Sequence, residues 1–332
     1  LQITKPSEDF YFPLTKAPSI VRIDPDLTVL AKIEFKPPVA MLHAQLADKD
    51  DALGRTIAIE LLGKRKDQKT VGKLKDTLNS DSFHEVRIAA SKALRNIGSD
   101  TALDALNAST DQKDARVRRQ VIVDTGSFFK PESLATLKAI FAKEKNPGIR
   151  GDILRALAGH DDAAAGKLIL QGLQSRSFRH QLADASISAM RKQDDSTYVK
   201  PLLAALKSDE KKFTSRGFAG GLKALAHLSR NAENKSTVRR FLVRYVNNLN
   251  QRKSLAAIEA LGTLGDPRAQ AVLQKLADTG KETRTSSTAE SAIAKIQAGN
   301  KPEDALQGIN KELAELKKAN EKPYSLKKSR IS

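Results

Sequence analysis

The sequence has no cysteine and no tryptophan, and only 5% of its residues are aromatic. The absence of cysteine excludes disulfides, thiolate nucleophiles and cysteine-based zinc or iron–sulfur sites in this chain. No stretch approaches the roughly 20 apolar residues that span a bilayer, and residues 1–10 lack the apolar core of a signal peptide. The apolar side chains are mostly Ala, Leu, Ile and Val, which favours closely packed helices over a β-sandwich.

Known catalytic and metal-binding patterns are also absent from the sequence. No two of the five histidines lie three to five residues apart, so there is no local zinc pair. There is no Walker loop, EF-hand loop or nucleophile elbow. The turn His160-Asp161-Asp162 carries oxygen ligands for a cation, but a solvated turn is the favoured interpretation. We predict no catalytic residue, no metal ligand and no cofactor in this chain.

The charge is strongly basic, with a net +18 over 332 residues. Since residues 311–332 hold seven Lys/Arg and three Glu, most of this excess lies in the body of the chain. Such a charge attracts polyanions and does not indicate a fold. The candidate polyanion contacts are Lys64, Arg65, Lys66, Lys211, Lys212, Arg239, Arg240, Arg244, Arg252 and Lys253.

A helical pattern recurs along the chain. Residues 86–98 read VRIAASKALRNIG, with small or apolar residues three and four apart on one helical face. Similar segments recur about every 30–40 residues, and a shorter Leu-rich helical pattern lies between them. Such helix pairs bury their apolar faces only by stacking on neighbouring pairs. We therefore predict an all-α fold, a right-handed α-α superhelix of about eight helix pairs with one concave helical face.

The repeat pattern resembles HEAT repeats, in which an acidic residue at the turn pairs with an Arg in the next helix. Four such pairs are expected: Asp81–Arg87, Asp111–Arg118, Glu144–Arg150 and Asp209–Arg216. The full series of structural repeat arginines is Arg55, Arg87, Arg118, Arg150, Arg179 and Arg216, and Ser254 and Ser286 take the same place in the last two units. A groove that meets phosphates in register is the alternative reading of the series, and the structural role is favoured. Left-handed helix caps are expected at Gly63, Gly98, Gly126 and Gly159.

Both ends of the chain differ from the repeats. Residues 1–36 contain three short β-type runs, 10–14, 20–24 and 29–35, which we interpret as the end of an upstream β-domain. Helical repeats are expected over residues 37–299. Residues 300–332 are predicted to form an amphipathic helix that caps the array, followed by a basic tail. Because residue 1 is Leu and not Met, we expect a piece of a longer protein.

The N-terminal junction carries a more specific resemblance. Residues 18–38, PSIVRIDPDLTVLAKIEFKPP, run into residues 41–63, MLHAQLADKDDALGRTIAIELLG. This junction resembles that of bacterial M1-family (aminopeptidase N-like) zinc metallo-aminopeptidases, where the last strands of a β-sandwich lead into a HEAT-like C-terminal domain. The DSF of residues 81–83, followed by VR and AA in residues 86–90, matches the next phrase of that family, and the resemblance extends to about residue 200.

What the resemblance implies is a non-catalytic C-terminal domain of such an enzyme or of an inactive relative. The family's His-Glu-x-x-His zinc helix and Gly-x-Met-Glu-Asn loop are not in this chain, so zinc is expected only in an upstream catalytic domain. The domain would cover the active-site chamber or mediate protein interaction. Its expected partners are the upstream domain and a protein or peptide on the concave face, with no membrane. The alternative is a stand-alone basic HEAT-like protein that binds nucleic acid.

Overall fold

The computed structural model describes residues 4–278 and 283–299 of the protein. Within these residues the regular structure is entirely helical, and sixteen α-helices form eight consecutive pairs. In the first half of the chain they are α1 (Val39–Ala47), α2 (Ala52–Leu62), α3 (Gln68–Ser80), α4 (His84–Ile97), α5 (Asp100–Asn107), α6 (Ala115–Thr125), α7 (Pro131–Lys143) and α8 (Pro147–Leu157). The second half holds α9 (Ala163–Gln174), α10 (Gln181–Gln193), α11 (Val199–Ser208), α12 (Ser215–Leu228), α13 (Ser236–Val243), α14 (Gln251–Leu264), α15 (Gln270–Ala277) and α16 (Arg284–Gly299). The predicted all-α class with about eight helix pairs is confirmed for this part of the chain.

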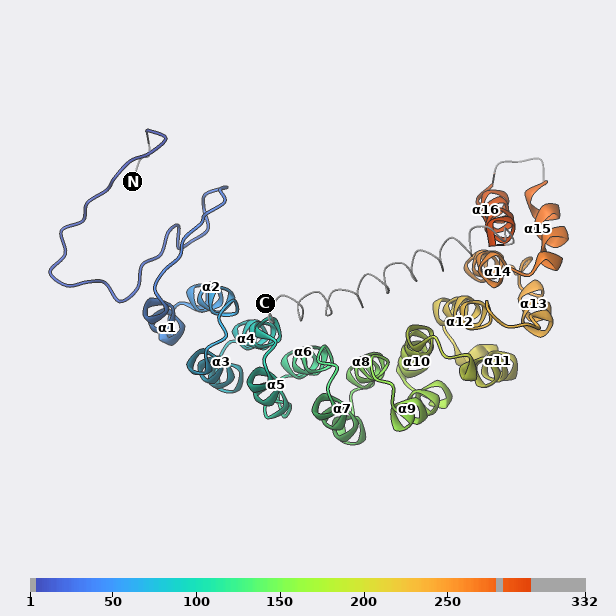
Figure 1. The fold of residues 1–332 in the computed structure, drawn as a ribbon, viewed down its shortest axis with the longest axis horizontal. Helices are drawn as coiled ribbons and strands as arrows, with labels where there is room; N and C mark the ends of the chain where they lie inside the picture. Colours follow the sequence, from blue (N-terminus) through green and yellow to red (C-terminus); the bar gives the residue numbers. More distant parts are fainter. Residues whose placement is uncertain (1–3, 279–282, 300–332) are drawn as a thin grey trace, which may run out of the picture. The chain divides into compact units, whose positions relative to one another are not determined.

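The chain forms two compact units, residues 1–144 and 145–332. In the first unit the second helices of the pairs, α2, α4 and α6, lie side by side in one row, and α3, α5 and α7 lie in the other (Figure 1). In the second unit α8, α10, α12, α14 and α16 form one row of neighbours, and α9, α11, α13 and α15 form the other row (Figure 1). Helices α2, α4 and α6 of the first unit and α10, α12, α14 and α16 of the second thus pack on their own partner helix and on second helices of the same unit.

Helix α4 shows how the sequence produces this packing. Its buried apolar residues recur three or four positions apart, so they form one stripe that faces the neighbouring helices: Val86, Ala90, Ala93, Leu94 and Ile97. The helix ends at Gly98, whose φ of +66° is the left-handed conformation that glycine adopts without strain. Most other helix starts are capped by a side chain, as in α2, where the Asp51 carboxylate accepts from the Gly54 amide at 2.7 Å.

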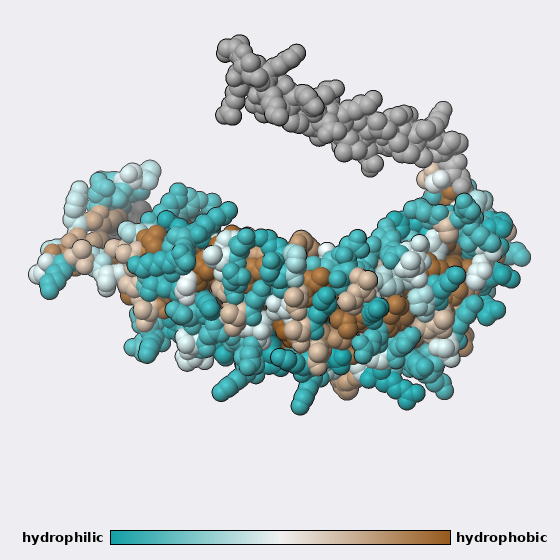
Figure 2. Space-filling model, turned by 60° about the horizontal axis from the view of Figure 1, so that its bottom comes forward, coloured by the Kyte–Doolittle hydropathy of each residue, from teal (hydrophilic) through white to brown (hydrophobic). Residues whose placement is uncertain are grey.

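Alanine and glycine bring the second helices of the second unit close together. A Cβ added to Gly262 on α14 would lie 2.8 Å from the Ala292 Cα on α16. Only a glycine therefore fits at this seam. In both units the face shown in Figure 2 is mostly hydrophilic, with apolar residues visible in the narrow gaps between helices. No described helix combines the length and apolar character needed to cross a membrane.

Two local predictions are corrected by the structure. The β-type runs in residues 10–35 form no strand in the described chain, because no ladder of backbone hydrogen bonds joins them to a second segment. Of the four expected glycine caps only Gly98 is left-handed. Gly63 and Gly126 are right-handed, with φ of −60° and −68°, and Gly159 is not among the positive-φ glycines. The predicted capping helix over residues 300–332 lies outside the described residues.

Candidate functional site

Four of the predicted repeat arginines share one structural position. They are the fourth residue of a second helix in each case: Arg55 in α2, Arg87 in α4, Arg118 in α6 and Arg150 in α8. In the first unit the side chain at this position contacts the turn of the following pair, 25 or 26 residues later in the sequence. This arginine therefore connects one helix pair to the next.

The Arg55 contact is the most buried of these. Its Nε and Nη2 donate to the two carboxylate oxygens of Asp81 at 2.7 and 3.1 Å, and its Nη1 donates to the carbonyls of Asp48 and Lys49. The side chains of Arg55 and Asp81 are 4% and 9% exposed. A guanidinium that makes two parallel bonds to a carboxylate holds both groups in one geometry. This pair thus ties the loop before α2 to the loop before α4.

The same arrangement recurs in the next two steps of the first unit. The Arg118 Nε donates to Glu144 at 2.6 Å and its Nη1 donates to the Gln112 carbonyl at 2.7 Å. At the step between the Arg55 and Arg118 contacts, the Arg87 Nη1 donates to the side-chain oxygen of Gln112 at 3.4 Å, so an amide takes the place of the carboxylate. The contact is weaker there because the Gln112 amide is neutral and only Arg87 carries a charge.

These contacts correct the predicted pairing of the turn carboxylates. Asp81 was expected to pair with Arg87, six residues later, and Glu144 with Arg150. Asp81 pairs instead with Arg55 of the preceding helix pair, and Glu144 pairs with Arg118, also of the preceding pair. For Asp81 the reason is the side-by-side packing of α2 and α4, which brings the turn before α4 over the fourth residue of α2. Sequence distance alone favoured the local partner.

Arg179 and Arg216 do not share this position. Arg179 lies in the 3-10 segment η1 (Phe178–His180) with a φ of +51°, and its guanidinium stands 5.4 Å from the centre of the Phe178 ring. Arg216 is the second residue of α12, and the fourth residue there is the fully buried Phe218. In α14 the fourth residue is Ser254, as predicted, and its hydroxyl donates to the Val246 carbonyl at 2.5 Å.

Arg216 belongs instead to a basic groove on the row of second helices in the second unit. The groove has a volume of about 500 Å³ and crosses α12, α14 and α16. We call it the arginine groove, and its charged lining residues are Arg216, Lys223, Arg252, Glu259 and Arg284. Arg252 was a predicted polyanion contact. Arg284 was in no predicted set, although its separation of 32 residues from Arg252 is a repeat period that would have revealed it.

The other predicted polyanion contacts do not gather into one surface. Arg239 pairs with Asp266 at 2.9 Å, and Lys253 pairs with Glu210 and lies 5.1 Å from the centre of the Phe218 ring. Lys64 and Arg65 line a separate hollow beside residues 32–37. The remaining residues, Lys66, Lys211, Lys212, Arg240 and Arg244, are exposed. Pairing removes Arg239 and Lys253 from the set of available cations.

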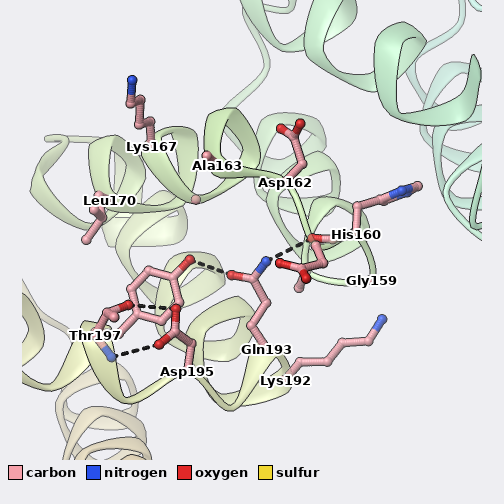
Figure 3. Close-up of a pocket in the computed structure, with 14 residues that line it drawn as sticks. Gly159, His160, Asp162, Ala163, Lys167, Leu170, Lys192, Gln193, Asp195 and Thr197 are labelled. Atoms are coloured by element: carbon pink, nitrogen blue, oxygen red, sulfur yellow. Dashed lines mark hydrogen bonds between the residues drawn. The ribbon is translucent and has the colours of Figure 1, made fainter. Parts of the chain in front are cut away.

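A second hollow, of about 710 Å³, lies between the loop after α8 and the loop after α10 (Figure 3). The Gln193 amide donates to the His160 carbonyl at 3.1 Å, and the Tyr198 hydroxyl donates to the Gln193 side-chain oxygen at 2.5 Å. Burial raises the pKa of the Tyr198 hydroxyl. Lys167 and Lys192 point away from this network (Figure 3).

The polar groups of this second hollow serve the fold. The Asp195 carboxylate accepts from the Thr197 amide and hydroxyl, and Asp162 caps α9 by accepting from the Ala165 amide at 2.8 Å. These bonds are local to the two loops, and the bond from Gln193 to the His160 carbonyl joins the loops. Together they occupy groups that a ligand would use. The His160-Asp161-Asp162 turn lies here, and within the described ranges no group of three or more His, Asp or Glu side chains is placed to hold a metal ion.

Comparison with known proteins identifies the repeats. Residues 39–125, which run from α1 to α6, match the HEAT-repeat family model, and residues 255–279 match the PBS lyase HEAT-like repeat. Among solved structures, human deoxyhypusine hydroxylase in complex with glycerol is 18% identical over 79% of this chain and 86% of that chain. Its TM-score of 0.33 is too low to support an argument. The curated proteins give no match. The chain is built from HEAT-like repeats.

Proposed function

We propose that this chain is the non-catalytic HEAT-like domain of an M1-type metallo-aminopeptidase or of an inactive relative. In this role it covers the active-site chamber or supports protein interaction, and its N-terminal segment, residues 4–36, docks on a second domain. The observation that carries the proposal is the exposure of large apolar side chains along this segment: Phe10, Tyr11, Phe12, Leu14, Val21, Ile23, Leu27, Val29, Leu30 and Ile33.

Such exposure is costly in a chain that stands alone. Burying one large apolar side chain contributes about 1.5–3 kcal/mol, and exposed apolar patches of this size mark interaction surfaces. The β-type residues and the unpaired backbone of this segment are suited to adding strands to a sheet. A second domain with a sheet edge would satisfy both the side chains and the backbone.

An ion pair anchors the N-terminal segment to the first helix pair. Arg22 forms an ion pair with Asp51, the residue that caps α2, and its Nη2 donates to the Pro25 carbonyl at 2.6 Å. The Asp24 carboxylate accepts from the amides of Thr28 and Val29, and these bonds lower its pKa. The segment thus has a defined position beside α2 while its apolar side chains face outward. The resemblance of residues 18–63 to the M1 junction supports an aminopeptidase as the parent protein.

The experiment compares this chain with the longer protein encoded by its reading frame. We expect a domain with a His-Glu-x-x-His helix upstream, and hydrolysis of amino-acid anilides with zinc by an active longer protein but not by this chain. Chymotrypsin should cut after Phe10 and Tyr11 in the isolated chain and be blocked there in the longer protein. The exposed Phe129 and Phe178 serve as matched control sites, cut in both. Anilide turnover by this chain alone, or equal cutting at Tyr11 in both proteins, would refute the proposal.

A further inference from the structure

The arginine groove holds more positive charge than its own residues neutralise. Among the described residues, Glu259 is the only acidic one that lines it, and it pairs with Lys223. In the described part of the chain the guanidinium groups of Arg216, Arg252 and Arg284 form no ion pair and no hydrogen bond within the protein. Three like charges that share one hollow repel one another, so an anionic ligand relieves their repulsion as well as binding to them.

The floor of the groove is small and mostly apolar. It is formed by Ala219 and Gly220 on α12 and by Leu255 and Ala256 on α14. A Cβ added to Gly220 would meet nothing within 4 Å, so the floor is open at this point. No aromatic side chain of the described residues lines the groove, whereas proteins that bind single-stranded nucleic acid stack bases on aromatic rings. An apolar floor with a cationic rim fits a polypeptide backbone better than stacked bases.

The spacing of the three arginines follows from the repeat. Each lies in the first two residues of its helix, and α12, α14 and α16 are successive neighbours in one row. Packed helices lie about 8–10 Å apart. A polyproline II segment has three residues per turn and rises about 3.1 Å per residue, so its side chains three residues apart lie on one face about 9 Å apart. The helix N-termini add partial positive charge at the same three places.

We propose that the arginine groove binds an acidic segment of a partner protein in the polyproline II conformation, with carboxylates three residues apart. Each carboxylate meets one of Arg216, Arg252 and Arg284, whose planar guanidinium groups suit two-point contacts with a carboxylate. This site is separate from the N-terminal segment and does not depend on an aminopeptidase as the parent protein.

The test is a fluorescence-anisotropy titration of the full chain with a fluorescein-labelled peptide of four Glu-Gly-Ser repeats at low salt. The variant Arg216→Gln/Arg252→Gln/Arg284→Gln should bind this peptide about tenfold more weakly, since three exposed ion pairs are lost. The matched control is Lys211→Gln/Lys212→Gln/Arg240→Gln, which removes the same charge from exposed positions outside the groove. Its affinity should change by less than about twofold, because distant surface charges are screened.

Three results would overturn this inference. Equal losses in the two triple variants would show that the peptide follows net charge and not the groove. Equally tight binding of a peptide of the same composition with its four glutamates adjacent would show that the spacing of the carboxylates has no role. Tighter binding of a single-stranded or duplex DNA oligonucleotide that needs the same three arginines would make nucleic acid the ligand. Circular-dichroism melts of both triple variants verify that they are folded.

Discussion

Two arginines of the first unit and two of the second are used in opposite ways. In the first unit Arg55 and Arg118 bind carboxylates of the following helix pair and are largely buried. In the second unit Arg216 and Arg252 lie at comparable repeat intervals, yet they are exposed at the rim of a groove. The residue type is the same in both units, so its identity does not determine its role.

The position of the arginine within its helix makes the difference. As the fourth residue of α2, Arg55 lies under the turn of the next pair, whose Asp81 meets it. As the second residue of α12, Arg216 lies half a turn earlier, and the buried fourth position is taken by Phe218. A shift of two residues on a helix is a rotation of about 200°, which moves a side chain from one face to the opposite one. The four predictions that follow test this comparison, from the largest expected effect to the smallest.

The largest effect is expected for Arg55→Met. Removing one partner of a buried ion pair leaves the other charge unpaired, which costs about 3–5 kcal/mol of unfolding free energy. Urea unfolding followed by circular dichroism measures the loss. Arg116→Met is the matched control in the same unit, because Arg116 pairs with Asp114 in a solvent-exposed position, and its effect should be far smaller. Similar losses in both variants would contradict the structural role of Arg55.

Next in size is the contrast between a packed and an open glycine in the second unit. Gly262→Ala places a Cβ 2.8 Å from the Ala292 Cα and should destabilise by about 1–3 kcal/mol through overpacking. Gly220→Ala meets nothing within 4 Å and should stabilise by about 0.5–1 kcal/mol, since alanine favours a helix over glycine. Thermal melts of the two variants should therefore shift in opposite directions. Lower melting temperatures for both variants would mean that Gly220 has no room for a Cβ and that the groove floor is closed.

A buried carboxylate in the first unit gives a pH-dependent effect. Burial raises the pKa of Asp124, although Ser91 and Gln120 donate to it and Arg95 lies 3.2 Å away. The folded state therefore holds the proton to a higher pH than the unfolded chain does. The resulting stabilisation is complete below the ordinary pKa of aspartate and is lost as pH rises through the raised value.

The measurement for Asp124 is the unfolding free energy of the wild-type protein minus that of Asp124→Asn, from about pH 3 to 7. This difference should fall as pH rises, because the variant has no proton to lose at this position. A difference that increases with pH would show that the charge of Arg95 outweighs burial.

The smallest effect is expected for the stability of the triple variant Arg216→Gln/Arg252→Gln/Arg284→Gln. Because these side chains form no ion pair or hydrogen bond in the described chain, the unfolding free energy should stay within about 0.5 kcal/mol of the wild-type value. A small gain is consistent with relief of repulsion. A loss as large as that of Arg55→Met would mean that the groove arginines stabilise the fold and would remove the basis of the comparison.

The helix pairs were predictable from the sequence because they depend on patterns within single helices. A buried stripe such as that of Val86, Ala90 and Leu94 needs only the periodicity of one helix, and the pairs must stack because neither helix buries its stripe alone. The arginine positions were found as a series for the same reason. The partner of each arginine was not predictable, because it lies on the following pair and its identity depends on how neighbouring helices pack.

The arginine groove was only partly predictable. Arg252 stood out as part of a basic pair, whereas Arg216 was assigned a structural role and Arg284 was missed. Which lysines and arginines are free depends on where carboxylates such as Asp266 and Glu210 lie in space. The β-type runs of residues 10–35 were also misleading, since β propensity reports a preference that only a neighbouring strand can satisfy.

Coupling energies from double-mutant cycles test most directly whether position decides the role of a repeat arginine. One cycle combines Arg55→Met with Asp81→Asn. The other combines Arg216→Gln with Asp184→Asn, the half-buried carboxylate whose pKa burial raises while the Arg216 charge opposes that rise. Urea unfolding should give a coupling of about 1 kcal/mol or more for the first pair and below about 0.5 kcal/mol for the second. Equal couplings in the two cycles would contradict the account.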